Sequence, residues 1–166
     1  MSGGLHGVSF VKDGLFSAYA VIQDEKSSGT GGGTFTSGAW QTRDLNTEHF
    51  DPFDLVTIAS NRFTIQAGRY FIKAKAPAWN VNSHVAKLFN FTDTVDVEIG
   101  SVQQATASAN SAQTYSEVLA RIDISTAKAY EIRHQCDTTK TNDGFGVSMA
   151  IGAVEIYTVI EIWKEA

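Results

Sequence analysis

The feature that most constrains the fold is a two-residue alternation between apolar and charged positions. Residues 68–78 read GRYFIKAKAPA: positions 70, 72, 74 and 76 are apolar, and positions 69, 73 and 75 are charged. Residues 115–125 read YSEVLARIDIS and repeat the pattern, with apolar residues at 118, 120, 122 and 124. Successive side chains of a β-strand point to opposite faces of the sheet, so this period predicts strands that bury one face.

The remaining segments also favour β structure. Further strands are predicted over residues 17–25, 83–93, 95–102, 129–136 and 153–165, with turn-rich loops at 27–34, 103–113 and 137–146. Charged residues make up only 19% of the chain, and only two prolines occur, so most of the chain is able to pair in sheets. The sequence therefore predicts an all-β fold, a single jelly-roll sandwich of about ten antiparallel strands.

A chain of 166 residues is long enough for one domain with its own core. We expect residues 17–166 to form the jelly-roll domain and residues 1–16 to form an N-terminal arm. The arm contains Leu5, Val8, Phe10 and Phe16, so we expect it to pack on another surface. In the strand over residues 95–102, the odd positions from Val95 to Ile99 are expected to point inward.

The last predicted strand, AVEIYTVIEIWKE, is apolar on both faces. Ile156, Ile160 and Ile162 share one face, and the other face carries Tyr157, Val159 and Trp163. In a two-sheet sandwich only one face of a strand meets the core. The second face must therefore contact another chain or a covering element of the same chain, and we expect Tyr157, Val159 and Trp163 to lie at an interface between subunits.

Charge and cysteine content exclude several classes of partner. The net charge is −5, which argues against nucleic acid and against an anionic membrane surface. No apolar run approaches the roughly 20 residues of a membrane span, so no membrane insertion is expected. The single Cys136 excludes an internal disulfide and a cysteine-based metal site, and we expect it to be a buried thiol.

No catalytic, cofactor or metal motif is present. The four histidines, His6, His49, His84 and His134, are at least 35 residues apart. The run GTGGGT lacks the lysine of a phosphate-binding loop, and no pair of acids stands out for glycoside hydrolysis. We therefore predict a protein that is not an enzyme and that needs no cofactor or metal.

Two stretches contain candidate ligand-binding residues. Trp79 lies next to Asn80, Asn82 and His84, a combination of an aromatic ring with amides that suits sugar stacking. The alternative is that Trp79 packs over the rim of the sandwich, whereas His84 is expected to be exposed.

The second stretch is TSGAWQTRDLNT, which holds Trp40, Arg43 and Asp44. Adjacent strand residues point to opposite faces, so Arg43 and Asp44 are not expected to bind one ligand together. Each is expected to pair with a neighbouring strand or subunit, and Trp40 is expected to be a packing anchor.

Four segments, taken in order, resemble a known family. They are SGAWQTRDLNT, SNRFTIQAGRYFIKAKAPA, HVAKLFNFTD and GFGVSMAIGAVEIYTVIEIWKE. Together they are similar to a bacteriophage structural-protein module with the jelly roll shared by tumour necrosis factor and the globular head of the first complement component. The shape F-x-I-x-A-G-x-Y, from Phe63 to Tyr70, matches the entry into a central strand, and E-I-W-K matches the end of the last strand.

The resemblance covers residues 17–165 and implies a homotrimer whose inner sheets meet at a threefold axis. It also implies a protein made in the host cytoplasm and carried on the virion surface, as a capsid decoration or cement protein, a head fibre or the tip of a tail fibre. Its partners would be itself, other capsid or tail proteins, and a glycan or protein of the host surface. About 16 residues precede the module, which favours decoration or cement if Met1 is the natural start. A carbohydrate-binding module is the alternative function.

Overall fold

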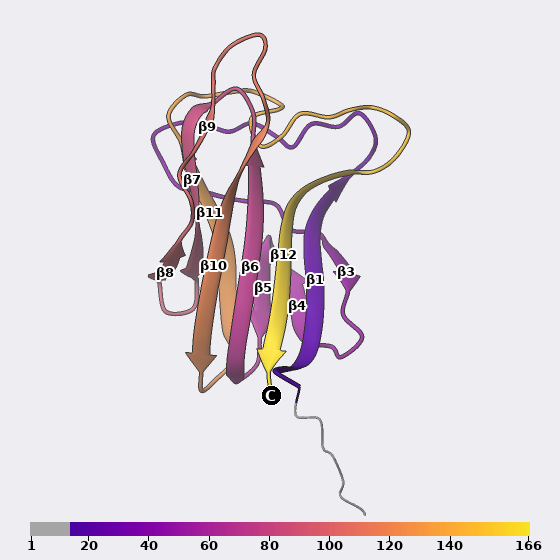
Figure 1. Ribbon diagram of the computed structural model, residues 1–166, viewed down its shortest axis with the longest axis vertical. Coiled ribbons are helices and arrows are strands. Elements are labelled where there is room, and N and C mark those ends of the chain that lie inside the picture. The colour runs from indigo at the N-terminus through magenta and orange to yellow at the C-terminus, as the bar shows by residue number, and fades with distance from the viewer. Residues whose placement is uncertain (1–13) are drawn as a thin grey trace, which may run out of the picture.

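Twelve strands and no helix make up residues 14–166, the part of the chain that the computed structural model describes (Figure 1). The strands are β1 Phe16–Lys26, β2 Gln41–Thr42, β3 Thr47–Phe50, β4 Val56–Ala59, β5 Arg62–Ile65, β6 Gly68–Ala78, β7 Asn82–Asn90, β8 Val95–Ile99, β9 Gln103–Ala105, β10 Thr114–Ile124, β11 Lys128–Cys136 and β12 Glu155–Glu165. The expected arm lies outside the described residues except for residues 14–16, of which Phe16 already belongs to β1.

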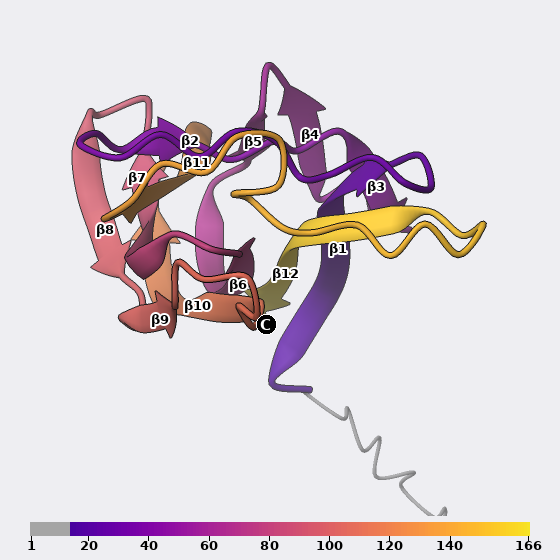
Figure 2. The same ribbon diagram turned by 90° about the horizontal axis from the view of Figure 1, so that it is seen from above.

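The strands form two layers, which Figure 2 shows from above. The five-stranded sheet has the order β10-β6-β12-β1-β3, and the seven-stranded sheet has the order β4-β5-β11-β7-β8, with β2 added to β11 and β9 added to β7. The last strand thus lies in the middle of its sheet, between β6 and β1, both of which it pairs antiparallel. The predicted jelly roll is confirmed, and short strands such as β2 and β9 bring the number above the expected ten.

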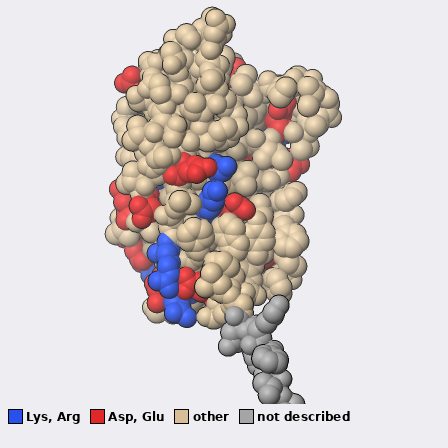
Figure 3. Space-filling view, in the orientation of Figure 1, with Lys and Arg blue, Asp and Glu red and all other residues tan. Residues whose placement is uncertain are grey.

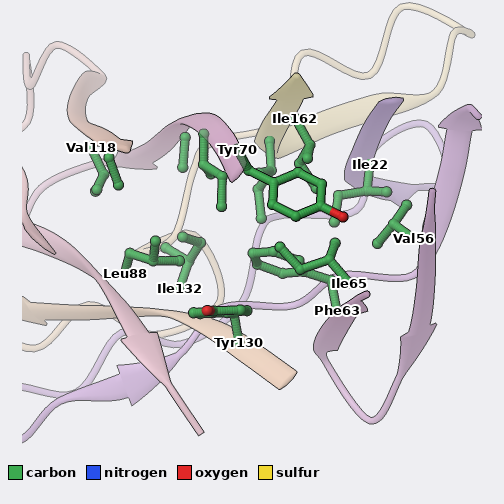
Figure 4. Close-up of a cluster of buried hydrophobic side chains, with 14 of the residues drawn as sticks. Ile22, Val56, Phe63, Ile65, Tyr70, Leu88, Val118, Tyr130, Ile132 and Ile162 are labelled. Carbon is green, nitrogen blue, oxygen red and sulfur yellow. The ribbon is translucent and has the colours of Figure 1, made fainter. Parts of the chain in front are cut away.

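The alternating pattern of β6 and β10 fills the space between the sheets. The two strands pair in register, so that Tyr70 lies opposite Ile122 and Ala74 lies opposite Val118. Figure 4 shows Tyr70, Ile22 and Ile162 of the five-stranded sheet facing residues of the seven-stranded sheet, among them Leu88, Ile132, Phe63 and Tyr130. Each large apolar side chain buried in this way stabilises the fold by about 1.5–3 kcal/mol.

The last strand has two apolar faces, as predicted, but its residues divide differently. Ile160 and Ile162 are buried in the core, while Ile156 is 47% exposed. The register between β1 and β12 shifts between Gln23 and Glu25, where β12 has one extra residue, so that the alternation reverses: Ile156 is exposed and Tyr157 is buried. The expectation that Ile156 shares the buried face was therefore wrong.

Strand β8 also differs from the prediction. Val97 packs against the core, but Val95 and Ile99 are exposed. The strand is the edge of its sheet, and its pairing with β7 contains a register shift between Leu88 and Phe89. Alternation alone does not show that an edge strand has no second layer over most of its length.

The stretch that contains Trp40, Arg43 and Asp44 contributes to the interior. Arg43 is only 1% exposed, and Asp44 points away from it to Lys26 and Asn61. The opposite directions of these two neighbours were predicted. Trp40 is half-buried, with the Lys87 ammonium 4.0 Å from the centre of its ring.

The guanidinium of Arg43 is satisfied by uncharged groups. It donates to Thr158 Oγ1 at 2.8 Å, to the carbonyl of Pro77 at 3.2 Å and to the carbonyl of Phe145 at 2.9 Å. The same guanidinium lies 4.1 Å from the centre of the Phe145 ring. Burial lowers the pKa of Arg43 to about 9, so the group stays charged at neutral pH.

Candidate functional site

A cluster of aromatic rings lies on the outer face of the five-stranded sheet. Trp163 on β12 is at its centre, with ring centroids 5.1 Å from Tyr19, 5.5 Å from Phe71 and 6.2 Å from Phe16. Tyr19 also contacts Phe50 on the edge strand β3, at 6.0 Å. Four strands contribute because each aromatic residue occupies an outward position in the register of this sheet. We call these five residues the aromatic face.

Several of the charged residues around the aromatic face are paired within the chain. Arg121 donates two hydrogen bonds to Glu165, at 2.6 and 2.8 Å, and Lys75 lies 3.2 Å from Glu117. The Tyr19 hydroxyl donates to Glu161 at 2.8 Å, and burial together with this carboxylate raises the pKa of Tyr19 to about 12. Figure 3 views this side of the molecule and shows the red and blue patches next to each other, with a largely tan surface around them.

A second apolar strip runs along the edge strand β10. Leu119 and Tyr115 are exposed there, and Ile99 and Val102 are exposed on the adjoining segment. Ser101 joins that segment to β10, because its amide donates to Glu117 O and its hydroxyl accepts from the Glu117 amide. We call these four apolar residues the edge strip.

The outer face of the seven-stranded sheet is closed by its own side chains. Glu131, which is buried, accepts hydrogen bonds from Arg62, Arg133 and Thr42. The Arg62 guanidinium lies 3.4 Å above the Phe91 ring, and the Arg133 guanidinium lies 3.4 Å above the Phe89 ring. The two arginines that lie over these rings are thus already hydrogen-bonded to Glu131. This face therefore differs from the aromatic face, where the rings have no such cover.

The predicted interface residues on the last strand have different positions. Val159 and Trp163 lie half-buried on the outer face, and Trp163 belongs to the aromatic face. Tyr157 is covered within its own subunit, where its ring packs against Gly146 and its hydroxyl donates to the carbonyl of Thr30 at 2.7 Å. Burial raises the pKa of Tyr157 to about 12.

The sequence analysis missed Tyr19, Phe50 and Phe71 as members of this face. The signal was present in the alternation of β6, where Phe71 is the one apolar residue between Arg69 and Lys73 on the outward side. An apolar residue between charged residues on the outward side indicates that this side is covered by another surface.

The predicted ligand cluster serves mainly to hold loops. Trp79 Nε1 donates to the carbonyl of Ser111 at 3.0 Å, and Asn80 Nδ2 donates to the carbonyl of Ser108 at 2.7 Å. Asn82 bridges two loops, because it donates to Thr138 Oγ1 and accepts from the amide of residue 107. Both asparagines have positive φ values, 58° and 60°, which asparagine tolerates better than most residues. The structure brings Trp79, Asn80 and Asn82 to one end of the sandwich.

His84 does not join this cluster at the surface. It was expected to be exposed, but it is 2% exposed and points into the sandwich, where it contacts His134. It takes this position because it lies on the inward side of β7 together with Ala86 and Leu88. The Trp79 ring, which was the candidate for sugar stacking, is also partly covered, since the Lys140 ammonium lies 4.8 Å from its centre.

Within residues 14–166, no three side chains of His, Cys, Asp or Glu are arranged to hold a metal ion. In the same part of the chain, no helix is long and apolar enough to cross a membrane. Cys136 is buried, as predicted, and burial raises the pKa of its thiol to about 11.

No family model matches this chain, and no curated protein matches it. Among solved structures, the globular domain of the zebrafish complement 1qA protein is similar with a TM-score of 0.51 at 12% identity, over 88% of this chain and 95% of that chain. Murine APRIL is similar with a TM-score of 0.52 at 8% identity, over 88% of this chain and 98% of that chain. At such identities the likeness shows the fold, which is the predicted jelly roll of the complement-head and tumour-necrosis-factor type.

Proposed function

We propose that this protein is a non-enzymatic structural module that assembles into a homotrimer through the outer face of the five-stranded sheet. The observation that carries the proposal is the difference between the two outer faces. One is closed by an internal network of acids, arginines and aromatic rings around Glu131. The other presents Trp163, Phe71 and Tyr19 with no covering element within residues 14–166.

The aromatic face and the edge strip fit a head-to-tail contact. A contact between two different patches of the same chain generates a ring when the rotation closes, and three subunits form the smallest ring beyond a dimer. Leu119 of the edge strip projects from β10 on the same side of the sheet as Phe71 of the aromatic face, since these strands are neighbours. Lys75 with Glu117 and Arg121 with Glu165 are already paired, so burying these four groups leaves none of them without a partner.

We further propose that the trimer is a bacteriophage virion protein, either a capsid decoration or cement protein or a fibre tip that contacts the host surface. The resemblance of the four sequence segments supports this placement. The arrangement of the sandwich is compatible with it: residue 166 is hydrogen-bonded to residue 15 at one end of the sandwich, and the long loops lie at the opposite end (Figure 1). Three copies of a weak site at that loop end raise the avidity for a repetitive host surface.

The assembly is tested by a charge introduced on the edge strip. Leu119 is 53% exposed in the subunit, so Leu119→Asp leaves the subunit fold intact but places a carboxylate in the proposed contact. Thr57→Asp on β4 is the matched control, because Thr57 is also exposed but lies on the other sheet. We expect Leu119→Asp to be monomeric and Thr57→Asp to be trimeric in sedimentation analysis. If Leu119→Asp and Thr57→Asp form assemblies of the same mass in solution, the result would contradict assembly through the outer face of the five-stranded sheet.

The placement is tested on the particle that carries the protein. Antibodies raised against the purified protein are expected to label intact virions, on the capsid for a decoration protein and on the fibre for a tip. Absence of label from intact and from disrupted particles would contradict a virion role, while leaving the result on assembly unchanged.

A further inference from the structure

Two buried histidines contact each other between the sheets. His84 Nδ1 and His134 Nε2 are 2.9 Å apart, and His84 Nε2 lies 2.8 Å from Thr114 Oγ1. His84 is 2% exposed and His134 is fully buried. His134 Nδ1 has no hydrogen-bond partner among the described residues. A neutral pair satisfies both contacts: between the two histidines one ring nitrogen donates and the other accepts, and the Thr114 hydroxyl can either donate to or accept from His84 Nε2.

Protonation of both rings disrupts this arrangement. If both rings are charged, both facing nitrogens carry hydrogen, and the 2.9 Å contact between His84 and His134 becomes a repulsion between two donors. A charge on His134 also places its Nδ1–H, which has no acceptor among the described residues, in a dry environment.

The surroundings of the pair contain a cation. The Phe145 ring is stacked on His134 at a centroid distance of 6.4 Å, and the Arg43 guanidinium lies over the same Phe145 ring. Phe35 packs against His134 at 4.7 Å. The pair therefore lies next to a buried positive charge and two aromatic rings.

One acid lies near the pair on the other elements: Asp137 lines the same pocket as His84 and Cys136, but it forms no hydrogen bond with either histidine. Opposite the histidines, β2 and β9 pair through the uncharged Gln41 and Gln103, and β10 contributes the hydroxyl of Thr114. On β11 the neighbouring titratable group is the thiol of Cys136, whose pKa is raised.

The acids that influence Arg43 are engaged elsewhere. Asp24 and Asp44 both form ion pairs with Lys26, at 3.1 and 2.8 Å. No acid within residues 14–166 forms a hydrogen bond with either histidine. Burial, and then the charge of Arg43, lower the pKa of His84 to about 4 and the pKa of His134 well below its usual value.

The pair lies in a part of the core that is distinct from the main one. A small cluster of Phe35, Val81, Cys136, Phe145 and two alanines is separate from the large cluster between the sheets. Loop-to-loop hydrogen bonds surround it: the amide of Phe35 donates to Lys140 O, and the amide of Trp79 donates to Gly144 O. The loop end, which we define as residues 31–43 and 137–147, is thus held by the small cluster.

We propose that the His84–His134 contact is an acid-sensitive switch that holds the loop end closed at neutral pH and releases it when the pair takes up protons. The two rings that pack on His134, Phe35 and Phe145, belong to the small cluster and not to the large one, so we expect the sandwich below the loop end to stay folded during the release. The proposal concerns one subunit and does not depend on trimer formation or on virion placement.

The direction of the pH effect follows from the two states. In the opened loop end the histidines take up protons near their ordinary pKa of 6.5, whereas in the closed form burial lowers the pKa of His84 to about 4. The closed form is therefore favoured above pH 6.5 and loses stability as the pH falls from 6.5 towards 4. At pH 5.0, which is 1.5 units below 6.5, the opening equilibrium is expected to rise about 30-fold if one proton is taken up and about 1,000-fold if two are.

Hydrogen exchange of the full chain, read by mass spectrometry at pH 7.4 and pH 5.0, tests the proposal. After correction for the chemical exchange rate, the wild-type peptides from the loop end are expected to lose protection by a factor in that range. Peptides from β6 and β12 are expected to keep theirs.

Three variants separate the histidine pair from other acid effects. The double variant His84→Gln/His134→Gln is expected to show the same loop-end protection at both pH values. Should it fail to fold, His84→Gln alone, which removes one of the two titrating rings, is expected to show a smaller loss of loop-end protection than the wild type. His49→Gln, on the exposed side of β3, should behave as wild type. An equal loss of protection in loop and strand peptides, or the same pH response in the wild type and the pair variants, would overturn the proposal.

Discussion

Replacing Arg43 by methionine tests whether a buried cation without a carboxylate partner organises the interior. The change keeps most of the side-chain length and removes three hydrogen bonds, to Thr158 Oγ1, Pro77 O and Phe145 O. Each of the two carbonyls left without a donor costs about 1–3 kcal/mol, and the lost contact with the Phe145 ring costs about 0.5–2 kcal/mol. Methionine no longer carries a desolvated charge, which offsets part of this cost. We expect a net loss of about 3 kcal/mol in the free energy of unfolding.

For a domain of this size, about 3 kcal/mol corresponds to a fall in Tm of about 6–12 °C. Urea unfolding followed by tryptophan fluorescence, at one fixed protein concentration, gives the free energy directly, and calorimetry gives the Tm. The control is Arg69→Met, because Arg69 is exposed and its nearest acid, Glu165, is 3.9 Å away. A change of less than about 0.5 kcal/mol for Arg43→Met, the size typical of a surface substitution, would refute the reasoning.

Three further substitutions examine the closed sheet, a tight loop and the first aromatic anchor. Glu131→Gln is expected to lower the free energy of unfolding by about 1–3 kcal/mol, measured in urea at pH 7. Burial alone would raise the pKa of Glu131, but the hydrogen bonds from Arg133 and Arg62 outweigh burial and lower it. The greater stability of the wild type is therefore present above pH 4.5 and is lost as the pH falls through the pKa of Glu131 in the folded protein. Gly146→Ala is expected to destabilise by about 2 kcal/mol or more, because the φ of 141° disfavours alanine and the new methyl group would collide with the Tyr157 ring. Gly38→Ala is the control, because Gly38 also has a positive φ, 91°, but has open space around it; equal stability of the two variants would contradict the collision. Trp40→Ala is expected to lower the Tm through the lost Lys87 contact, worth about 1–2 kcal/mol, without changing the mass of the assembly, and a monomeric variant would contradict the role of a packing anchor.

The period of the sequence was sufficient to predict the layers of the fold. Alternation in β6 and β10 identified the buried face correctly, because a side chain on a strand with one covered face has only two directions available. It was insufficient for β8, where Ile99 belongs to an apolar series but lies at an open edge. Whether a face is covered depends on the neighbouring strand, which a local pattern does not contain.

The candidate sites were harder to predict, for the same reason. Trp79 and Asn80 looked like a binding cluster, and their hydrogen bonds to Ser111 and Ser108 come from a loop about 30 residues away in the chain. The contact between His84 and His134 joins residues 50 apart, and no spacing rule applies to such a pair. Trp163 was recognised because β12 is apolar on both faces, which is a local property.

The mass of the native protein in solution tests the central claim most directly. One chain is 18.0 kDa, so the proposed trimer is expected at about 54 kDa by native mass spectrometry and by light scattering at micromolar concentration. A stable species of 54 kDa that Leu119→Asp converts to 18.0 kDa is the result that the aromatic face and the edge strip lead us to expect. A wild-type protein that remains at 18.0 kDa across this concentration range would contradict assembly through the five-stranded sheet.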